Sequence, residues 1–148
     1  RKPRSLSIRS AQKVKLIFVD TLYWVALANL RDQWHERAIE LQKTVSNRRL
    51  ITTEAVLIEF LNYFSSFGSF MRQTVAGITH DILDDPDIEV LPIHSSLFLS
   101  GLNLDEQRLD KGYSMVDCIS MMAIKNRDIS EVLTHDKHFI QEGFNILL

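Results

Sequence analysis

The sequence is poor in cysteine, with Cys118 the only one among 148 residues. A lone cysteine cannot form a disulfide within the chain, and the sequence has neither a CxxC motif nor the His/Cys spacing of a zinc site. A chain of this length buries roughly two thirds of its unfolded surface in one core, so it needs no cross-link to fold. The sequence therefore indicates one globular domain and favours a reducing, cytoplasmic location.

Long hydrophobic runs are also missing. No stretch approaches the roughly 18 apolar residues that a membrane-spanning helix requires, and no apolar signal-peptide core is present near the first residues. There is no internal repeat and no low-complexity segment. We therefore expect a protein that is neither an integral membrane protein nor secreted.

Acidic residues are absent from the first fifteen positions, which hold six basic ones: Arg1, Lys2, Arg4, Arg9, Lys13 and Lys15. Of the 17 basic residues of the chain, 11 therefore remain beside all 19 acidic ones. Residues 1–14 are predicted to be a basic, disordered N-terminal extension, with residues 15–148 forming the domain. An RNA-contacting arm, a targeting segment or a remnant of upstream translation are alternatives for the extension.

After residue 15, short apolar and β-branched runs alternate with amphipathic segments. Strands are predicted at residues 15–20, 50–52, 88–93, 131–134 and 144–148. Helices are predicted at residues 21–29, 32–45, 53–67, 70–83, 95–109, 114–126 and 137–141. Strands separated by helices pair in parallel through right-handed crossovers, which predicts an α/β fold, a three-layer α/β/α sandwich with a mostly parallel central sheet.

Four acidic residues lie at related places in this pattern. Asp20 and Asp136 follow the first and fourth strands, at the carboxyl ends where open parallel sheets bind ligands. Asp117 lies in the first turn of a helix that Ser114 is predicted to cap. Glu59 lies one to two turns into the helix that follows the second strand. All four should face the same rim of the sheet.

The apolar neighbours of these four residues indicate partly buried carboxylates. Two carboxylates about 4 Å apart repel by roughly 4 kcal/mol at an effective dielectric constant near 20, so a cluster must protonate or bind cations. Oxygen ligands without a nearby histidine or cysteine cluster favour Mg²⁺ or Mn²⁺ over Zn²⁺. Bound cations would also offset the excess negative charge of the domain at a nucleic acid.

The segments around the four acids carry a family resemblance. VDTLYW around Asp20, LIEFLN around Glu59, YSMVDCISM around Asp117 and LTHDKHF around Asp136 resemble the four motifs of PIN domains. The resemblance is strongest to the VapC-type toxins of bacterial toxin-antitoxin pairs. It covers about residues 15–148, and no motif acid is missing.

This resemblance implies a metal-dependent endoribonuclease acting on single-stranded RNA, with Mg²⁺ or Mn²⁺ as cofactor. Asp20, Asp117 and Asp136 would be inner metal ligands, and Glu59 would bind a second metal or orient water. Ser114 or Thr21 are candidates to hydrogen-bond the carboxylates, with helix capping favoured for Ser114.

The resemblance also implies a cognate antitoxin as partner and a homodimer. One stripe of aromatic residues bears on these interfaces. We expect these side chains mainly to pack in the core, and as the alternative to line a homodimer interface or a groove for an antitoxin helix. The stripe consists of Phe60, Tyr63, Phe64, Phe67 and Phe70.

The histidines are weaker candidates for metal ligands or general bases. The five histidines share no metal-ligand spacing; they are His35, His80, His94, His135 and His138. We expect His135 to be a loop residue rather than a general base.

An aspartyl phosphotransferase is disfavoured because Leu22 occupies the position of its second aspartate. A receiver domain is disfavoured because His94, not an aspartate, follows the third strand. A catalytically silent PIN-like scaffold that binds RNA or protein remains the main alternative.

Overall fold

A five-stranded parallel sheet forms the centre of the molecule, in the order β3-β2-β1-β4-β5. The computed structural model describes residues 15–148, so the predicted basic extension lies outside the described residues. The strands are β1 (Leu16–Val19), β2 (Arg49–Thr53), β3 (Ile88–Leu91), β4 (Glu131–Leu133) and β5 (Asn145–Ile146). The predicted parallel sheet is confirmed.

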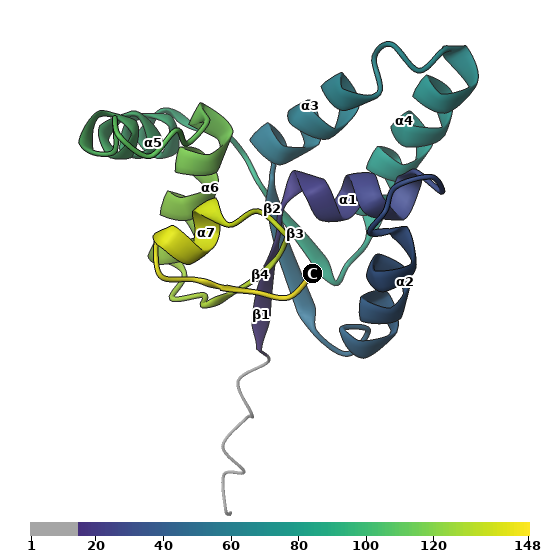
Figure 1. Ribbon diagram of the computed structural model, residues 1–148, viewed down its shortest axis with the longest axis horizontal. Coiled ribbons are helices and arrows are strands. Elements are labelled where there is room, and N and C mark those ends of the chain that lie inside the picture. Colours follow the sequence, from purple (N-terminus) through teal and green to yellow (C-terminus); the bar gives the residue numbers. More distant parts are fainter. Residues whose placement is uncertain (1–14) are drawn as a thin grey trace, which may run out of the picture.

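Helices cover both faces of this sheet, which confirms the three-layer α/β sandwich. Figure 1 shows α1 to α4 on one side and α5 to α7 on the other. The helices are α1 (Thr21–Ala28), α2 (His35–Thr44), α3 (Glu54–Tyr63), α4 (Ser69–Asp84), α5 (Ser95–Gln107), α6 (Met115–Asn126) and α7 (His138–Gln141). Within residues 15–148, none of these helices has the length and apolar character needed to cross a membrane.

The central strand β1 explains why the sheet forms where the sequence predicts it. Its residues Ile17, Phe18 and Val19 are fully buried, as expected of a strand packed between two layers of helices. The neighbouring strand β2 contributes Thr52, which is also fully buried. Its hydroxyl donates a hydrogen bond to the carbonyl of Val19 at 2.9 Å, so no polar group of this side chain is left unpaired.

Local capping signals set where α3 begins, and a turn sets where it ends. The Thr53 side chain accepts a hydrogen bond from the backbone N–H of Val56 at 3.1 Å, as the predicted cap requires. The prediction that this helix continues to residue 67 is wrong. It ends at Tyr63 because the chain turns through short-range backbone hydrogen bonds and reaches Gly68 at a φ of +88°. That backbone conformation favours glycine.

The aromatic stripe runs from α3 through the following turn to the start of α4, and it is divided between core and surface. Phe60 and Phe64 are fully buried, which confirms the core expectation for them. The same expectation is wrong for Tyr63, Phe67 and Phe70, whose exposed fractions are 45%, 47% and 82%. Tyr63, the last residue of α3, and Phe67, in the turn after it, lie outside the core, whereas Phe64 at the end of the helix still packs in it.

Close packing of α5 on α6 depends on Gly101, and this gives a first prediction. An alanine Cβ there would lie 2.8 Å from Cγ1 of the buried Ile119 and 3.2 Å from the Ile119 backbone. We expect Gly101→Ala to lower the free energy of unfolding by about 2 kcal/mol, measured by urea denaturation. Gly77 lies inside α4 with open space around it, so Gly77→Ala should instead stabilise the protein by about 0.5–1 kcal/mol. Equal effects at both glycines would contradict this account.

Candidate functional site

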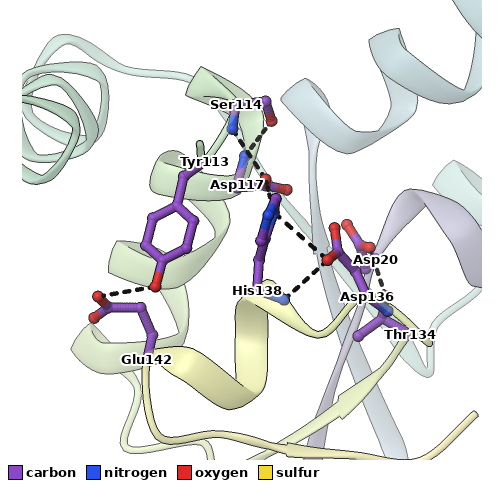
Figure 2. A network of polar contacts seen from close by, with 8 residues as sticks. All are labelled: Asp20, Tyr113, Ser114, Asp117, Thr134, Asp136, His138 and Glu142. Carbon is purple, nitrogen blue, oxygen red and sulfur yellow. Dashed lines mark hydrogen bonds and ion pairs between the residues drawn. The ribbon is translucent and has the colours of Figure 1, made fainter. Parts of the chain in front are cut away.

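Two of the four acids lie side by side at the carboxyl ends of β1 and β4. Asp20 follows β1 directly and is buried, with 3% of its surface exposed. Its backbone N–H donates to the carbonyl of Leu133, which extends the pairing of the two strands by one residue. Asp136 lies three residues beyond β4 and is half-buried. Parallel pairing therefore brings together residues that are 116 positions apart, as Figure 2 shows.

Thr134 connects these two acids. Its buried hydroxyl donates a 2.8 Å hydrogen bond to Oδ2 of Asp20 and accepts one of 3.1 Å from the backbone N–H of Asp136. One hydroxyl thus fixes the orientation of the first carboxylate and the path of the chain toward the second. Thr134 was not predicted as a site residue, although it stands inside the motif around Asp136.

Asp117 reaches the same rim from the first turn of α6. The Ser114 hydroxyl accepts from the backbone N–H of Asp117, and Oδ2 of Asp117 accepts from the backbone N–H of Ser114, both at 3.0 Å. This reciprocal capping box confirms the capping role expected for Ser114. Asp117 is buried, and the cap holds its carboxylate at the start of the helix.

Glu59 projects toward the other acids from the sixth position of α3 and is half-buried. Burial raises the pKa of Glu59, the nearby Thr21 hydroxyl opposes this, and the negative charges of Asp117 and Asp136 raise it further. Thr21 Oγ1 is buried and has no hydrogen-bond partner of standard geometry, although it lies close enough to favour the charged form of Glu59. The structure therefore brings all four predicted acids together.

Asp20 is the most perturbed of the four. Loss of water around this buried carboxyl raises its pKa to about 7, and the nearby charges of Asp117 and Glu59 add to the rise. The hydrogen bonds from Thr134 and from the backbone of Thr21 act in the opposite direction and are outweighed. A carboxylate at this position is therefore costly unless a cation accompanies it.

His138 also belongs to this cluster, and the sequence analysis did not single it out. Its Nδ1 lies 3.3 Å from Oδ2 of Asp117 and 3.5 Å from Oδ1 of Asp136. Its backbone N–H donates to the same Asp136 oxygen at 2.9 Å. Ligand atoms of the three residues all lie within 4.8 Å of one another. The sequence pattern indicated no histidine cluster, but one histidine lies beside the acids, because α7 starts two residues after Asp136 and turns this ring back toward them.

His135, in contrast, stacks on Trp34, with ring centroids 4.7 Å apart and planes 14° from parallel. It lies in the loop between β4 and α7, as expected.

The chemistry of these side chains fits a hard dication. Within residues 15–148, no lysine or arginine forms an ion pair with any of the four acids. The unpaired Thr21 hydroxyl adds a buried polar oxygen beside Asp20 and Glu59. Clustered carboxylate oxygens with no basic partner other than His138 are typical of a site for a divalent cation.

No family sequence model and no curated protein matches the chain. Solved structures do match. Mycobacterium tuberculosis VapC20, a Sarcin-Ricin loop cleaving toxin, is 25% identical, with a TM-score of 0.75 over 86% of this chain and 95% of that one. FitAB bound to a DNA fragment is 16% identical, with a TM-score of 0.66 over 88% and 93%. Rickettsia felis VapBC2 bound to a promoter DNA fragment is 15% identical, with a TM-score of 0.62 over 89% and 97%.

The parallel sheet, the two helical layers and the likeness to these structures give the chain the α/β fold of PIN domains. Its four motifs resemble those of VapC-type proteins, and VapC20 is among the structures to which it is similar.

Proposed function

We propose that this PIN domain is a metal-dependent endoribonuclease that acts as the toxin of a toxin-antitoxin pair. The observation that carries the proposal is the gathering of Asp20, Glu59, Asp117 and Asp136 at one rim without a lysine or arginine partner among residues 15–148. The likeness to VapC20, a Sarcin-Ricin loop cleaving toxin, supports RNA as the substrate class. We further propose residues 15–148 as a PIN-like domain, residues 1–14 as a basic N-terminal extension, and the cytoplasm as its location.

In this proposal Asp20, Asp117 and Asp136 hold Mg²⁺ or Mn²⁺, and Glu59 holds a second ion or orients water. A bound dication supplies positive charge that stabilises the phosphate transition state and favours loss of a proton from water. The protein fixes the ligands beforehand, through Thr134 on Asp20 and the Ser114 cap on Asp117. Burial raises the pKa of Glu59 above its ordinary value, which makes its carboxylate a stronger proton acceptor.

An antitoxin is the partner we propose, because the motifs resemble those of VapC-type toxins and two of the similar structures, FitAB and VapBC2, are two-component assemblies. We also propose a homodimer. The exposed Tyr63, Phe67 and Phe70 beside the end of α3 form an apolar surface of the kind that protein partners cover.

A silent scaffold is the second candidate, because a cluster of carboxylates can bind a cation without cleaving RNA. Only an assay of hydrolysis separates the two.

The proposed function is tested by incubating the full chain with labelled single-stranded RNA. We expect internal cleavage with Mn²⁺ or Mg²⁺ and none with excess EDTA. Asp117→Asn should lower the cleavage rate by at least about a hundredfold, because it removes a charged ligand while its amide oxygen can still cap α6. Asp84→Asn alters an exposed aspartate of α4 and should leave the rate unchanged. RNA binding without cleavage under all these conditions would favour the scaffold.

A further inference from the structure

The geometry points to a nitrogen ligand in this site. We propose that Nδ1 of His138 binds the dication together with Asp117 and Asp136, and that the site therefore prefers a first-row transition dication to Mg²⁺. The inference rests on the metal site of the proposed function and adds to it a ligand and a metal preference.

The distances suit one shared ion. Neighbouring ligands of an octahedral ion, each about 2.1–2.2 Å from the metal, lie about 3 Å apart. In the structure His138 Nδ1 is 3.3 Å from Asp117 Oδ2 and 3.5 Å from Asp136 Oδ1. Ligand atoms of all three residues lie within 4.8 Å of one another, close to the roughly 3–4.3 Å that separates two ligands of one octahedral ion.

The imidazole is held with Nδ1 toward the acids rather than toward solvent. The backbone N–H of His138 donates to Asp136, which fixes the start of α7. The ring of Tyr113 lies beside the imidazole, with centroids 5.2 Å apart and planes inclined by 58°. The Tyr113 hydroxyl in turn donates to Oε1 of Glu142 at 3.3 Å, so the tyrosine is itself held in place, as Figure 2 shows.

The ligand chemistry sets the preference. Mg²⁺ takes oxygen ligands almost exclusively and keeps several waters, so an imidazole adds little to its binding. Neutral imidazole is a good ligand for first-row transition dications, and carboxylates are also good ligands for Mn²⁺. One nitrogen among several carboxylate oxygens therefore favours an ion that accepts both, and Mn²⁺ is a spectroscopically visible probe of that class.

A hydrogen bond from His138 to the carboxylates is the competing account of the same contacts. Under that account His138 only orients Asp117 and Asp136, and no bond forms between nitrogen and metal. A spectroscopic signature of direct coordination separates the two.

The test is pulsed electron paramagnetic resonance of the full chain with one equivalent of Mn²⁺. We expect nuclear modulation from a directly bound imidazole nitrogen in the wild type and its loss in His138→Gln. Calorimetric titration should show that this variant binds Mn²⁺ about tenfold more weakly, with Mg²⁺ affinity nearly unchanged. His80→Gln, which alters an exposed histidine of α4, should retain the modulation and both affinities.

The outcomes separate this inference from the proposed function. Mn²⁺ bound without nitrogen modulation in the wild type would overturn the role of His138 and leave the carboxylate site standing. No binding of Mn²⁺ or Mg²⁺ at all would overturn both. The wild-type spectrum is decisive even if His138→Gln folds poorly, and His138→Asn, which keeps a hydrogen-bonding amide, provides a second variant.

Discussion

Asp20→Asn should make the metal-free protein more stable at pH 8, by roughly 2–4 kcal/mol, while lowering RNA cleavage by about 10²–10³-fold. The carboxyl of Asp20 is 3% exposed and its pKa is raised from 3.8 to about 7. Each unit of such a difference between the folded and unfolded states corresponds to about 1.4 kcal/mol. Asparagine has nearly the same shape, carries no charge, and can still accept the hydrogen bond from Thr134.

The direction of the pH dependence follows from whether the folded or the unfolded protein binds the Asp20 proton. Between pH 4 and 7 the unfolded chain has lost the Asp20 proton while the folded protein keeps it, so the stability of the wild type falls as the pH rises. Above pH 7 both states are ionised, and the loss is complete. Asp20→Asn has no ionisable group at this position. The amount by which its free energy of unfolding exceeds that of the wild type should therefore grow from pH 4 to 7 and then stay constant.

Urea denaturation at several pH values in EDTA measures this effect, with Asp84→Asn as the control whose stability should follow the wild type. Adding a dication should offset most of this difference. A ligand present at a hundred times its Kd stabilises the folded state by about 2.7 kcal/mol, and only the wild type retains the full site. An Asn variant that is less stable than the wild type at pH 8 without metal would show that Asp20 has a structural role instead.

Glu142→Ala is expected to lower the free energy of unfolding by about 3 kcal/mol, although Glu142 lies outside the acidic cluster. Its side chain is only 5% exposed and accepts from Arg108 at 2.6 Å and from Lys125 at 2.9 Å. Removing one partner of a buried ion pair typically costs about 3–5 kcal/mol. The lower end applies here because Arg108 and Lys125 are about a third exposed and regain water.

Lowering the pH should weaken the ion pairs of Glu142 with Arg108 and Lys125. Burial raises the pKa of Glu142, but the hydrogen bonds from Lys125 and Arg108 outweigh that effect, and the pKa is lowered overall. Its contribution is therefore present above the pKa of an unfolded glutamate, about 4.3, and is lost as the pH falls below that value.

Urea denaturation at pH 7 and pH 3.5 measures both effects. Glu106→Ala, at an exposed position of α5, should change stability by no more than about 0.5 kcal/mol. The Glu142 variant should also cleave RNA more slowly, because α7 carries His138 and follows Asp136. A Glu142→Ala protein as stable as the wild type would show that this network adds nothing to the docking of α7.

Much of the fold could be read from the sequence because its signals are local. The apolar run of β1 and the caps at Thr53 and Ser114 depend on residues within about four positions of one another. Such patterns predicted the parallel sheet and its helical layers. They failed at the end of α3, where the aromatic spacing continues but the chain turns toward Gly68.

The sequence by itself determined which acids follow strands and open helices, and so which rim of the sheet they share. Only the tertiary structure decided how deeply Asp20 is buried, and it alone brought His138 against Asp117 and Glu142 against Arg108. Those pairs are 21 and 34 positions apart and lie in or directly after helices whose mutual placement depends on packing. Periodicity and capping act within a few residues, whereas burial, pKa and ligand geometry depend on every element that surrounds a group.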